Sequence, residues 1–274
     1  MREGADKMKK VISYTALAIL AIIFIMPFII MVFGSLKEVK QAQIDPLFWL
    51  PTNPSIQNYI TIFTNGIFIR WIWNSIVITV IPVITQMLFA ALLGYIFAKK
   101  QFWGKEAIFW IFMAVIMIPQ QLFIIPKYIM FADFGWINTY WALIVPELWA
   151  IMGVFLVRQF LQGIPKDLEE AAYIDGANDW QIFFKIILPL SFPVIATVGT
   201  FAFISNWNDL FQPLIYLTNE KMFPVTVGLA SMLGKEGNFG VEMAGATISF
   251  IPTFLIFIFF QRYFTEGITM SGIK

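Results

Sequence analysis

The sequence predicts an all-α, polytopic membrane protein with six transmembrane helices in a single domain, residues 1–274. Its residues are 59% hydrophobic and only 13% charged, whereas about 25% of residues are charged in soluble globular domains. The mean hydropathy is +0.77, and the apolar residues form long runs separated by polar segments. Because a helix satisfies its own backbone hydrogen bonds in lipid, runs of about 20 apolar residues indicate membrane-spanning helices.

Six such runs follow one another along the chain. They cover residues 11–33, 71–98, 107–130, 137–157, 186–217 and 241–264. The first run is longer than the hydrophobic region of a signal peptide, about 7–15 residues, and no small-x-small cleavage motif follows it, so we expect it to remain as a span. Pro27 predicts a kink in this span, and Pro119 and Pro126 interrupt the third. The second contains Pro82.

Residues 34–70, between the first two spans, are predicted to form a loop with at most short helices. Pro46, Pro51 and Pro54 punctuate this segment. Its aromatic side chains suit a position at the level of the lipid headgroups; they are Phe48, Trp49, Tyr59 and Phe63.

The distribution of basic residues predicts the orientation. With both termini in the cytoplasm, 12 of the 18 Lys and Arg residues fall on the cytoplasmic side and six on the other. The short N-terminal tail and the loop at residues 99–105 carry most weight, because the positive-inside rule acts through short loops. An N-in, C-in topology places residues 158–185 in the cytoplasm.

Several kinds of chemistry are excluded by the residues present. The chain has no His and no Cys, which removes Ser-His-Asp triads, disulfides and histidine or cysteine metal sites. The phosphate-binding pattern G-x-x-x-x-G-K-[ST] is also missing, because Gly104-Lys105 and Gly234-Lys235 are each followed by Glu. We therefore expect no catalytic residue, metal or cofactor in this chain, and any use of ATP must come from a partner. The net charge of +1 gives no indication of nucleic-acid binding.

A polar stretch at residues 158–193 separates the fourth and fifth runs. It contains five acidic residues, Asp167, Glu169, Glu170, Asp175 and Asp179. Pro165 suits the first turn of a helix, and three of the acids then lie near the positive end of its dipole. Asp175-Gly176 predicts a turn before a second, amphipathic helix. The small side chains of Ala171 and Ala172 would let another protein approach closely; the alternative is an ordinary solvated loop.

A second group of polar residues lies inside the predicted spans. Its members are Glu147 in the fourth span, Asn206, Trp207, Asn208, Asp209 and Gln212 in the fifth, and Gln86 in the second. Polar groups are costly in lipid, so they should face a cavity or a partner helix. On a continuous helix Asn208 and Gln212 share one face, and Trp207 could stack on a sugar ring. These residues indicate either a substrate pathway or hydrogen bonds between helices.

The polar stretch resembles the signature loop of the permease subunits of bacterial ABC importers. The matching residues are Glu170-Ala171-Ala172, Asp175-Gly176-Ala177, Phe183, Ile186, Leu188-Pro189 and Pro193. Further motifs are similar to carbohydrate permeases of the maltose-transporter type, in particular the smaller, six-span subunit: Trp49-Leu50-Pro51, Asn58-Tyr59, Asn74-Ser75, Gly135, Asn138-Thr139, Trp207-Asn208-Asp209 and Gln261-Arg262-Tyr263-Phe264. The chain departs from this pattern at its last residues, Ser271-Gly272-Ile273-Lys274.

The resemblance implies a transport subunit in the bacterial cytoplasmic membrane. Its partners would be a homologous second permease, two ATPase subunits that carry ATP and Mg²⁺, and an extracellular solute-binding protein. The ATPase would be contacted by Glu169, Glu170, Ala171, Ala172, Asp175, Gly176 and Ala177, and Glu170 would pair with a basic residue there. The implied substrate is a sugar or oligosaccharide; the alternatives are another solute such as glycerol phosphate or a peptide, an ion-coupled carrier working alone, or a membrane-embedded enzyme.

Overall fold

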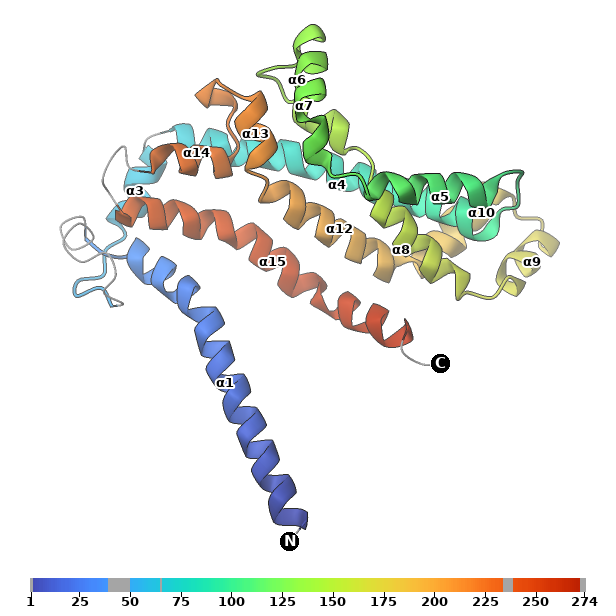
Figure 1. The fold of residues 1–274 in the computed structure, drawn as a ribbon, viewed down its shortest axis with the longest axis horizontal. Coiled ribbons are helices and arrows are strands. Elements are labelled where there is room, and N and C mark those ends of the chain that lie inside the picture. The colour runs from blue at the N-terminus through green and yellow to red at the C-terminus, as the bar shows by residue number, and fades with distance from the viewer. Residues whose placement is uncertain (1, 39–49, 65, 234–238, 272–274) are drawn as a thin grey trace. The chain divides into compact units, whose positions relative to one another are not determined.

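A computed structural model describes residues 2–38, 50–64, 66–233 and 239–271, and this part of the chain is mainly helical, without strands (Figure 1). The long helices are α1 (Arg2–Ser35), α4 (Ile67–Lys99), α5 (Lys105–Ile116), α8 (Ile151–Gln162), α12 (Phe192–Trp207) and α15 (Phe239–Ser271). The shorter ones are α3 (Gln57–Thr64), η1 (Gln120–Phe123), α6 (Ile124–Asp133), α7 (Trp141–Ile144), η2 (Val145–Glu147), α9 (Asp167–Ile174), α10 (Asp179–Ile182), η3 (Phe183–Ile187), α11 (Leu188–Leu190), α13 (Phe211–Tyr216), η4 (Glu220–Met222) and α14 (Val225–Met232).

Four helical segments of the described chain are long and apolar enough to cross a membrane. They are Lys7–Ser35, Ile67–Lys99, Trp141–Gln162 and Phe239–Tyr263. Two bent pairs bring the number to as many as six: Lys105–Ile116 with Gln120–Asp133, bent by 83°, and Asp179–Leu190 with Phe192–Trp207, bent by 73°. These segments correspond in order to the six predicted spans.

The third span is interrupted at Pro119 as predicted: α5 ends at Ile116, and Pro119 adopts an extended conformation (ψ 126°) before η1 begins. The predicted interruption at Pro126 is wrong, because Pro126 lies within α6.

The fifth predicted span also needs correction. The fifth, predicted to continue to residue 217, stops being helical at Trp207, and α13 starts only at Phe211. The Asp209 carboxylate accepts hydrogen bonds from the backbone N–H groups of Phe211 (2.9 Å) and Gln212 (3.3 Å). Asp209 therefore lies in the break between α12 and α13, where its carboxylate binds N–H groups at the start of α13, instead of lying within a continuous span.

The described residues fall into two compact units, Met1–Ile69 with Leu229–Phe250, and Arg70–Gly228 with Ile251–Lys274. In the first unit, Phe28 of α1 contacts Phe250 of α15, with ring centroids 4.7 Å apart. The loop after α1 contains the short helix α3, whose buried Asn58 donates hydrogen bonds to the carbonyls of Ser35 (2.9 Å) and Lys37 (2.7 Å). Of the four aromatic residues predicted at the headgroup level, Phe48 and Trp49 lie outside the described residues, as does Pro46.

Small residues bring the helices of the second unit close together. A Cβ atom on Gly94 of α4 would lie 2.6 Å from the side chain of Val157 in α8, and one on Gly153 of α8 would lie 2.9 Å from Val198 in α12. Such positions let helix backbones approach in membranes, where packing contributes much of the association energy. Ala90, at the same contact, is completely buried. This core packs the C-terminal end of α4 against α9 and η3.

Candidate functional site

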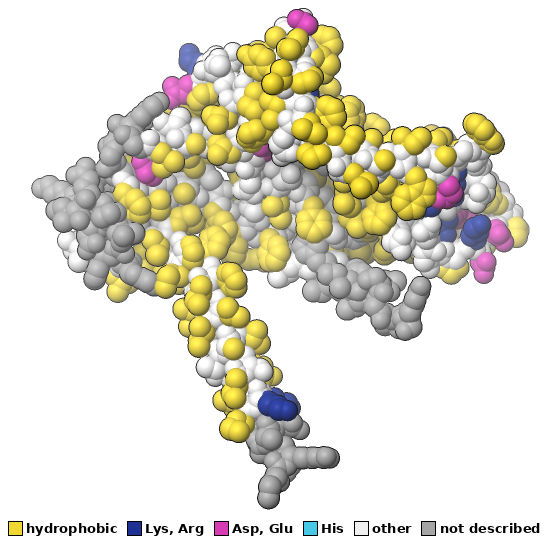
Figure 2. Space-filling view, viewed as in Figure 1, with side chains coloured by type: hydrophobic (Ala, Val, Ile, Leu, Met, Phe, Trp, Pro, Cys, Tyr) yellow, Lys and Arg dark blue, Asp and Glu magenta, His cyan; other side chains and the backbone are white. Residues whose placement is uncertain are grey.

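Helix α9 and the turn after it form the helix–glycine turn–helix arrangement that the sequence predicts. The first turn of α9 contains Asp167, Glu169 and Glu170, which are favourable near the positive end of the helix dipole. Gly176 has φ +82°, a conformation that glycine adopts without strain. The next helix, α10, begins with a capping box in which Asn178 and Gln181 exchange two hydrogen bonds of 2.9 Å. Figure 2 shows charged side chains gathered around this end of the second unit.

The predicted coupling residues divide between the two sides of α9. Glu170, Ala171, Asp175 and Gly176 are exposed. Glu169 (7% exposed) and Ala172 (8%) are instead buried against the protein's own core, and Ala177 is half-buried there. The prediction of a smooth outer surface made by both alanines is therefore wrong, because successive residues of a helix point in different directions and only Ala171 faces outward.

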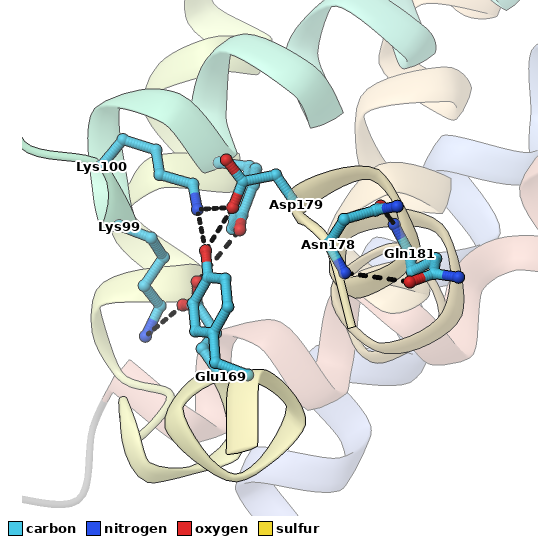
Figure 3. Close-up of polar contacts among 8 residues, drawn as sticks. Lys99, Lys100, Glu169, Asn178, Asp179 and Gln181 are labelled. Atoms are coloured by element: carbon cyan, nitrogen blue, oxygen red, sulfur yellow. Dashed lines mark hydrogen bonds and ion pairs between the residues drawn. The ribbon is translucent and has the colours of Figure 1, made fainter. Parts of the chain in front are cut away.

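Glu169 contacts the end of α4. Its Oε2 atom accepts a hydrogen bond of 3.0 Å from the Tyr95 hydroxyl, and its Oε1 atom lies 3.9 Å from Lys99 Nζ. Lys99 also donates a hydrogen bond of 2.5 Å to the Ile164 carbonyl. Figure 3 shows Lys99 and Glu169 facing each other from the two helices. Tyr95 was not among the predicted site residues; its position four residues before Lys99 places both on one face of α4.

A second set of contacts joins Lys100 to the opposite end of α9 and to α10. Lys100 Nζ donates hydrogen bonds of 2.7 Å to the Tyr173 hydroxyl and to Asp179 Oδ1, and Tyr173 also donates to Asp179. The hydrogen bonds from Lys100 and Tyr173 hold the pKa of Asp179 below its usual value. Burial disfavours the charged form of Lys100, but the hydrogen bonds to Asp179 and Tyr173 outweigh it, so the pKa of Lys100 is raised. Both groups are therefore charged at neutral pH.

Apart from Gln86, six residues were predicted within the spans as candidates for a substrate pathway, and four of them line one small cavity. The lining consists of Ile78, Leu143, Glu147, Asn206, Asp209, Gln212 and Pro213. Gln212 donates a hydrogen bond of 3.0 Å from Nε2 to Glu147 Oε1. Gln86, in α4, donates one of 2.6 Å to the Glu147 carbonyl. The cavity has carboxylate and amide groups beside apolar walls, and in this conformation it has room for about one water molecule.

The other two predicted pathway residues are placed elsewhere. Trp207 is only 4% exposed and stacks on Phe203, with ring centroids 5.5 Å apart. We predicted that its ring could stack on a sugar, but the ring is buried and not open to one. Asn208 is exposed and donates a hydrogen bond of 2.8 Å to the Ile204 carbonyl. The predicted shared face of Asn208 and Gln212 is also wrong, because α12 ends at Trp207.

The opposite end of α4 holds the segment at residues 220–225. Trp71 Nε1 donates a hydrogen bond of 2.9 Å to the Glu220 carbonyl, and Asn74 Nδ2 donates to the carbonyls of Lys221 (3.0 Å) and Phe223 (2.8 Å). Ser75 Oγ accepts a bond of 2.8 Å from the Val225 N–H group. This arrangement gives a physical role to Asn74-Ser75, one of the motifs in the sequence.

Comparison with known proteins places the chain in a family. Residues 90–270 match the family described as the binding-protein-dependent transport system inner membrane component. The chain belongs to this family. The matched range includes the signature loop and confirms the resemblance to ABC importer permeases drawn from it. Members of the family are membrane subunits of transport systems.

Relatives match over almost the whole length. The arabinooligosaccharides transport system permease protein AraQ of Halalkalibacterium halodurans is 34% identical over 96% of this chain and 95% of that protein. The trehalose/maltose transport system permease protein MalG of Thermococcus litoralis is 29% identical, with 100% and 99% covered. A chain in the crystal structure of a bacterial ABC transporter involved in alginate import is 24% identical, with 95% and 98% covered and a TM-score of 0.85. This likeness confirms the predicted all-α ABC importer permease fold.

Proposed function

We propose that this chain is a permease subunit of an ATP-driven importer for a sugar or oligosaccharide. The observation that carries the proposal is family membership together with relatives named for arabinooligosaccharide, trehalose/maltose and diacetylchitobiose transport. The carboxylate and amide groups gathered around Glu147 and Gln212 support it, because such groups can exchange hydrogen bonds with sugar hydroxyls once the space between the helices widens. The subunit would lie in a bacterial cytoplasmic membrane with both termini inside.

In this proposal the chain supplies the path and its partners supply the energy. A second permease would complete the translocation pathway, two ATPase subunits would bind ATP and Mg²⁺, and an external binding protein would deliver the solute. The exposed side of α9, with Glu170, Ala171 and Asp175, is the proposed contact for an ATPase. Closure of the ATPase pair would then move α9 as a rigid body and change which side of the membrane the cavity opens to.

The test is reconstitution of the chain with its partner subunits in proteoliposomes. Labelled arabinotriose, maltose, trehalose and diacetylchitobiose serve as probes, and ATP hydrolysis is measured in parallel. We expect uptake of at least one probe that requires ATP and the binding protein, and ATP hydrolysis that rises when both are present. Accumulation of a probe by the chain without any ATPase would refute the proposal.

A second candidate substrate class is supported by one relative. The osmoprotective compounds uptake permease protein GgtD of a Synechocystis strain is 34% identical over 73% of this chain and 69% of that protein. The same panel therefore includes an osmoprotective compound, and glycine betaine serves as the probe. Uptake of glycine betaine without uptake of any sugar would favour an importer of osmoprotective compounds.

A further inference from the structure

Two adjacent glutamates of α9 have different surroundings, and this difference bears on how the helix works. Glu170 is exposed, whereas Glu169 is buried and touches Tyr95 and Lys99. Side-chain exposure is only 4% for Lys99 and 9% for Glu169 at their contact. A carboxylate buried in this way cannot meet a docking protein unless α9 first leaves α4.

From these contacts we propose that Tyr95, Lys99 and Glu169 form a latch that fixes α9 to α4, and that Glu169 is a positioning residue which transmits motion within this chain. The proposal rests on the proposed function of the chain as an importer subunit. It corrects the assignment of Glu169 to the ATPase contact and leaves Glu170 in that contact.

Tyr95 is the centre of the latch. Its hydroxyl donates a hydrogen bond to Glu169, its ring centroid lies 5.5 Å from that of Phe183, and Lys100 Nζ lies 5.1 Å from its ring centroid. One α4 side chain therefore contacts the helix before the Gly176 turn and the helical segment after it. Lys100 adds a second attachment through Tyr173, one turn beyond Glu169 on the same helix. Two attachments on one face prevent α9 from rolling against α4.

Helix α4 connects this latch to the rest of the unit. It is a helix of 33 residues, and Tyr95 and Asn74 are separated by about 31 Å along it, at 1.5 Å per residue. Between them, Gln86 binds the Glu147 carbonyl and Ile78 lines the cavity. At the N-terminal end of α4, Trp71 and Asn74 hold the segment at residues 220–223. A displacement of α9 that is passed to α4 thus reaches both the cavity wall and the segment beyond it.

A pair of matched variants separates the latch from the ATPase contact. Glu169→Gln removes the charge that faces Lys99, and Glu170→Gln makes the same chemical change one residue away on the exposed side. Both are studied in the complete reconstituted complex. Two quantities are measured: the amount of ATPase that co-purifies with the permease, and the uptake per ATP hydrolysed of whichever of arabinotriose, maltose and diacetylchitobiose the wild type imports fastest.

We expect Glu169→Gln to retain the ATPase at the wild-type level while uptake per ATP falls about tenfold, a typical size for coupling between two sites. Glu170→Gln should lose ATPase from the complex. Tyr95→Phe, which keeps the carboxylate and removes only the hydroxyl, should also lower uptake per ATP. The double variant Tyr95→Phe with Glu169→Ala should be no worse than Glu169→Ala alone, because each change removes the hydrogen bond between these two side chains.

Two results would overturn the latch. If Glu169→Gln loses ATPase as Glu170→Gln does, Glu169 is a direct docking residue; if it keeps the wild-type uptake per ATP, the contact does not transmit motion. Should Glu169→Gln fail to accumulate in the membrane, Tyr95→Phe decides by the same two measurements. Failure of the wild-type complex to bind ATPase or import any probe would instead refute the proposed function, so the two failures are distinguishable.

Discussion

At the scale of single residues, consecutive side chains of α9 lie on two different sides of the helix, one buried in the protein and one exposed. Each step along a helix turns the side chain by about 100°. Glu169 and Ala172, three positions apart, point into the protein, whereas Glu170 and Ala171 point out. The pairs Glu-Glu and Ala-Ala therefore each contribute one residue to the core and one to the exposed side. Because both members of each pair are the same amino acid, the sequence does not show which one is buried and which one is exposed.

Gly176 offers a test at this scale. Its φ of +82° is strained for any residue with a Cβ atom, although no other atom lies within 4 Å of that position. Gly176→Ala should therefore destabilise the turn by about 1–2 kcal/mol through backbone strain alone. We expect normal insertion in the membrane and reduced uptake in the reconstituted complex. Membrane abundance and uptake are measured together.

The control is Gly163→Ala. Gly163 ends α8 with φ −77°, which alanine adopts without strain. This variant should transport like the wild type. Equal losses of uptake in the two variants would show that the conformation of Gly176 is not the cause, and loss of the Gly176→Ala protein from the membrane would indicate a role in folding.

At the scale of elements, two breaks between helices set the directions of the segments that follow them. Pro119 follows the end of α5, and a new helical segment leaves at an angle of 83°. The break at residues 208–210 has a different cause: the carboxylate of Asp209 binds the free N–H groups at the start of α13. Because of this second break, Gln212 meets Glu147 from its own short helix.

Close packing between α8 and α12 depends on Gly153. A Cβ atom there would lie 2.9 Å from Val198 Cγ1 and 3.0 Å from Ala90 Cβ. Gly153→Ala should lower the free energy of unfolding by about 1–3 kcal/mol, as overpacking does in other cores. Thermal unfolding of the purified protein in detergent measures the change.

Val198→Ala provides the complementary variant, because it removes the nearest clashing atom. Combined with Gly153→Ala it should recover part of the lost stability, so the effects of the two changes should not add. Strict additivity of the two losses would mean that the helices shift apart and that Val198 is not the obstacle.

Considering the second unit as a whole, polar residues distant in sequence converge at one cavity. Glu147 comes from the segment before α8, Asn206 from α12 and Gln212 from α13. Helix α4 passes this cavity and also contacts α9 at one end and residues 220–223 at the other. Events at the signature loop and at the cavity can therefore be linked through a single helix.

If the substrate passes through the cavity, removing the side-chain amide of Gln212 should lower uptake more than removing that of Asn208. Gln212→Ala removes a lining group that binds Glu147, whereas Asn208→Ala removes an exposed amide that does not line the cavity. We expect sugar uptake to fall about ten- to a hundredfold for Gln212→Ala, because losing a hydrogen bond to a charged group costs about 1.5–3 kcal/mol. Asn208→Ala should keep wild-type uptake.

Uptake is compared at equal amounts of assembled complex, with ATPase content as the control. A fall for Asn208→Ala with no change for Gln212→Ala would contradict a role for the cavity in the pathway.

By itself, the sequence determined the class of protein, the order of its spans and the position of its signature loop. These features follow from local properties: apolar runs long enough to cross a bilayer, a proline that ends a helix, and a glycine that permits a turn. Such properties act between neighbours in the chain, so they can be recognised without knowing what packs against them.

Only the tertiary structure decided which side of each element works. It placed Glu169 against Tyr95 and Lys99, buried Trp207 on Phe203, and gathered Glu147 with Gln212 at one cavity. Each of these outcomes depends on contacts between residues far apart in the sequence. The physical reason is that burial and pairing are set by the neighbouring helix, and the end of α12 at Trp207 changed that neighbourhood for every polar residue after it.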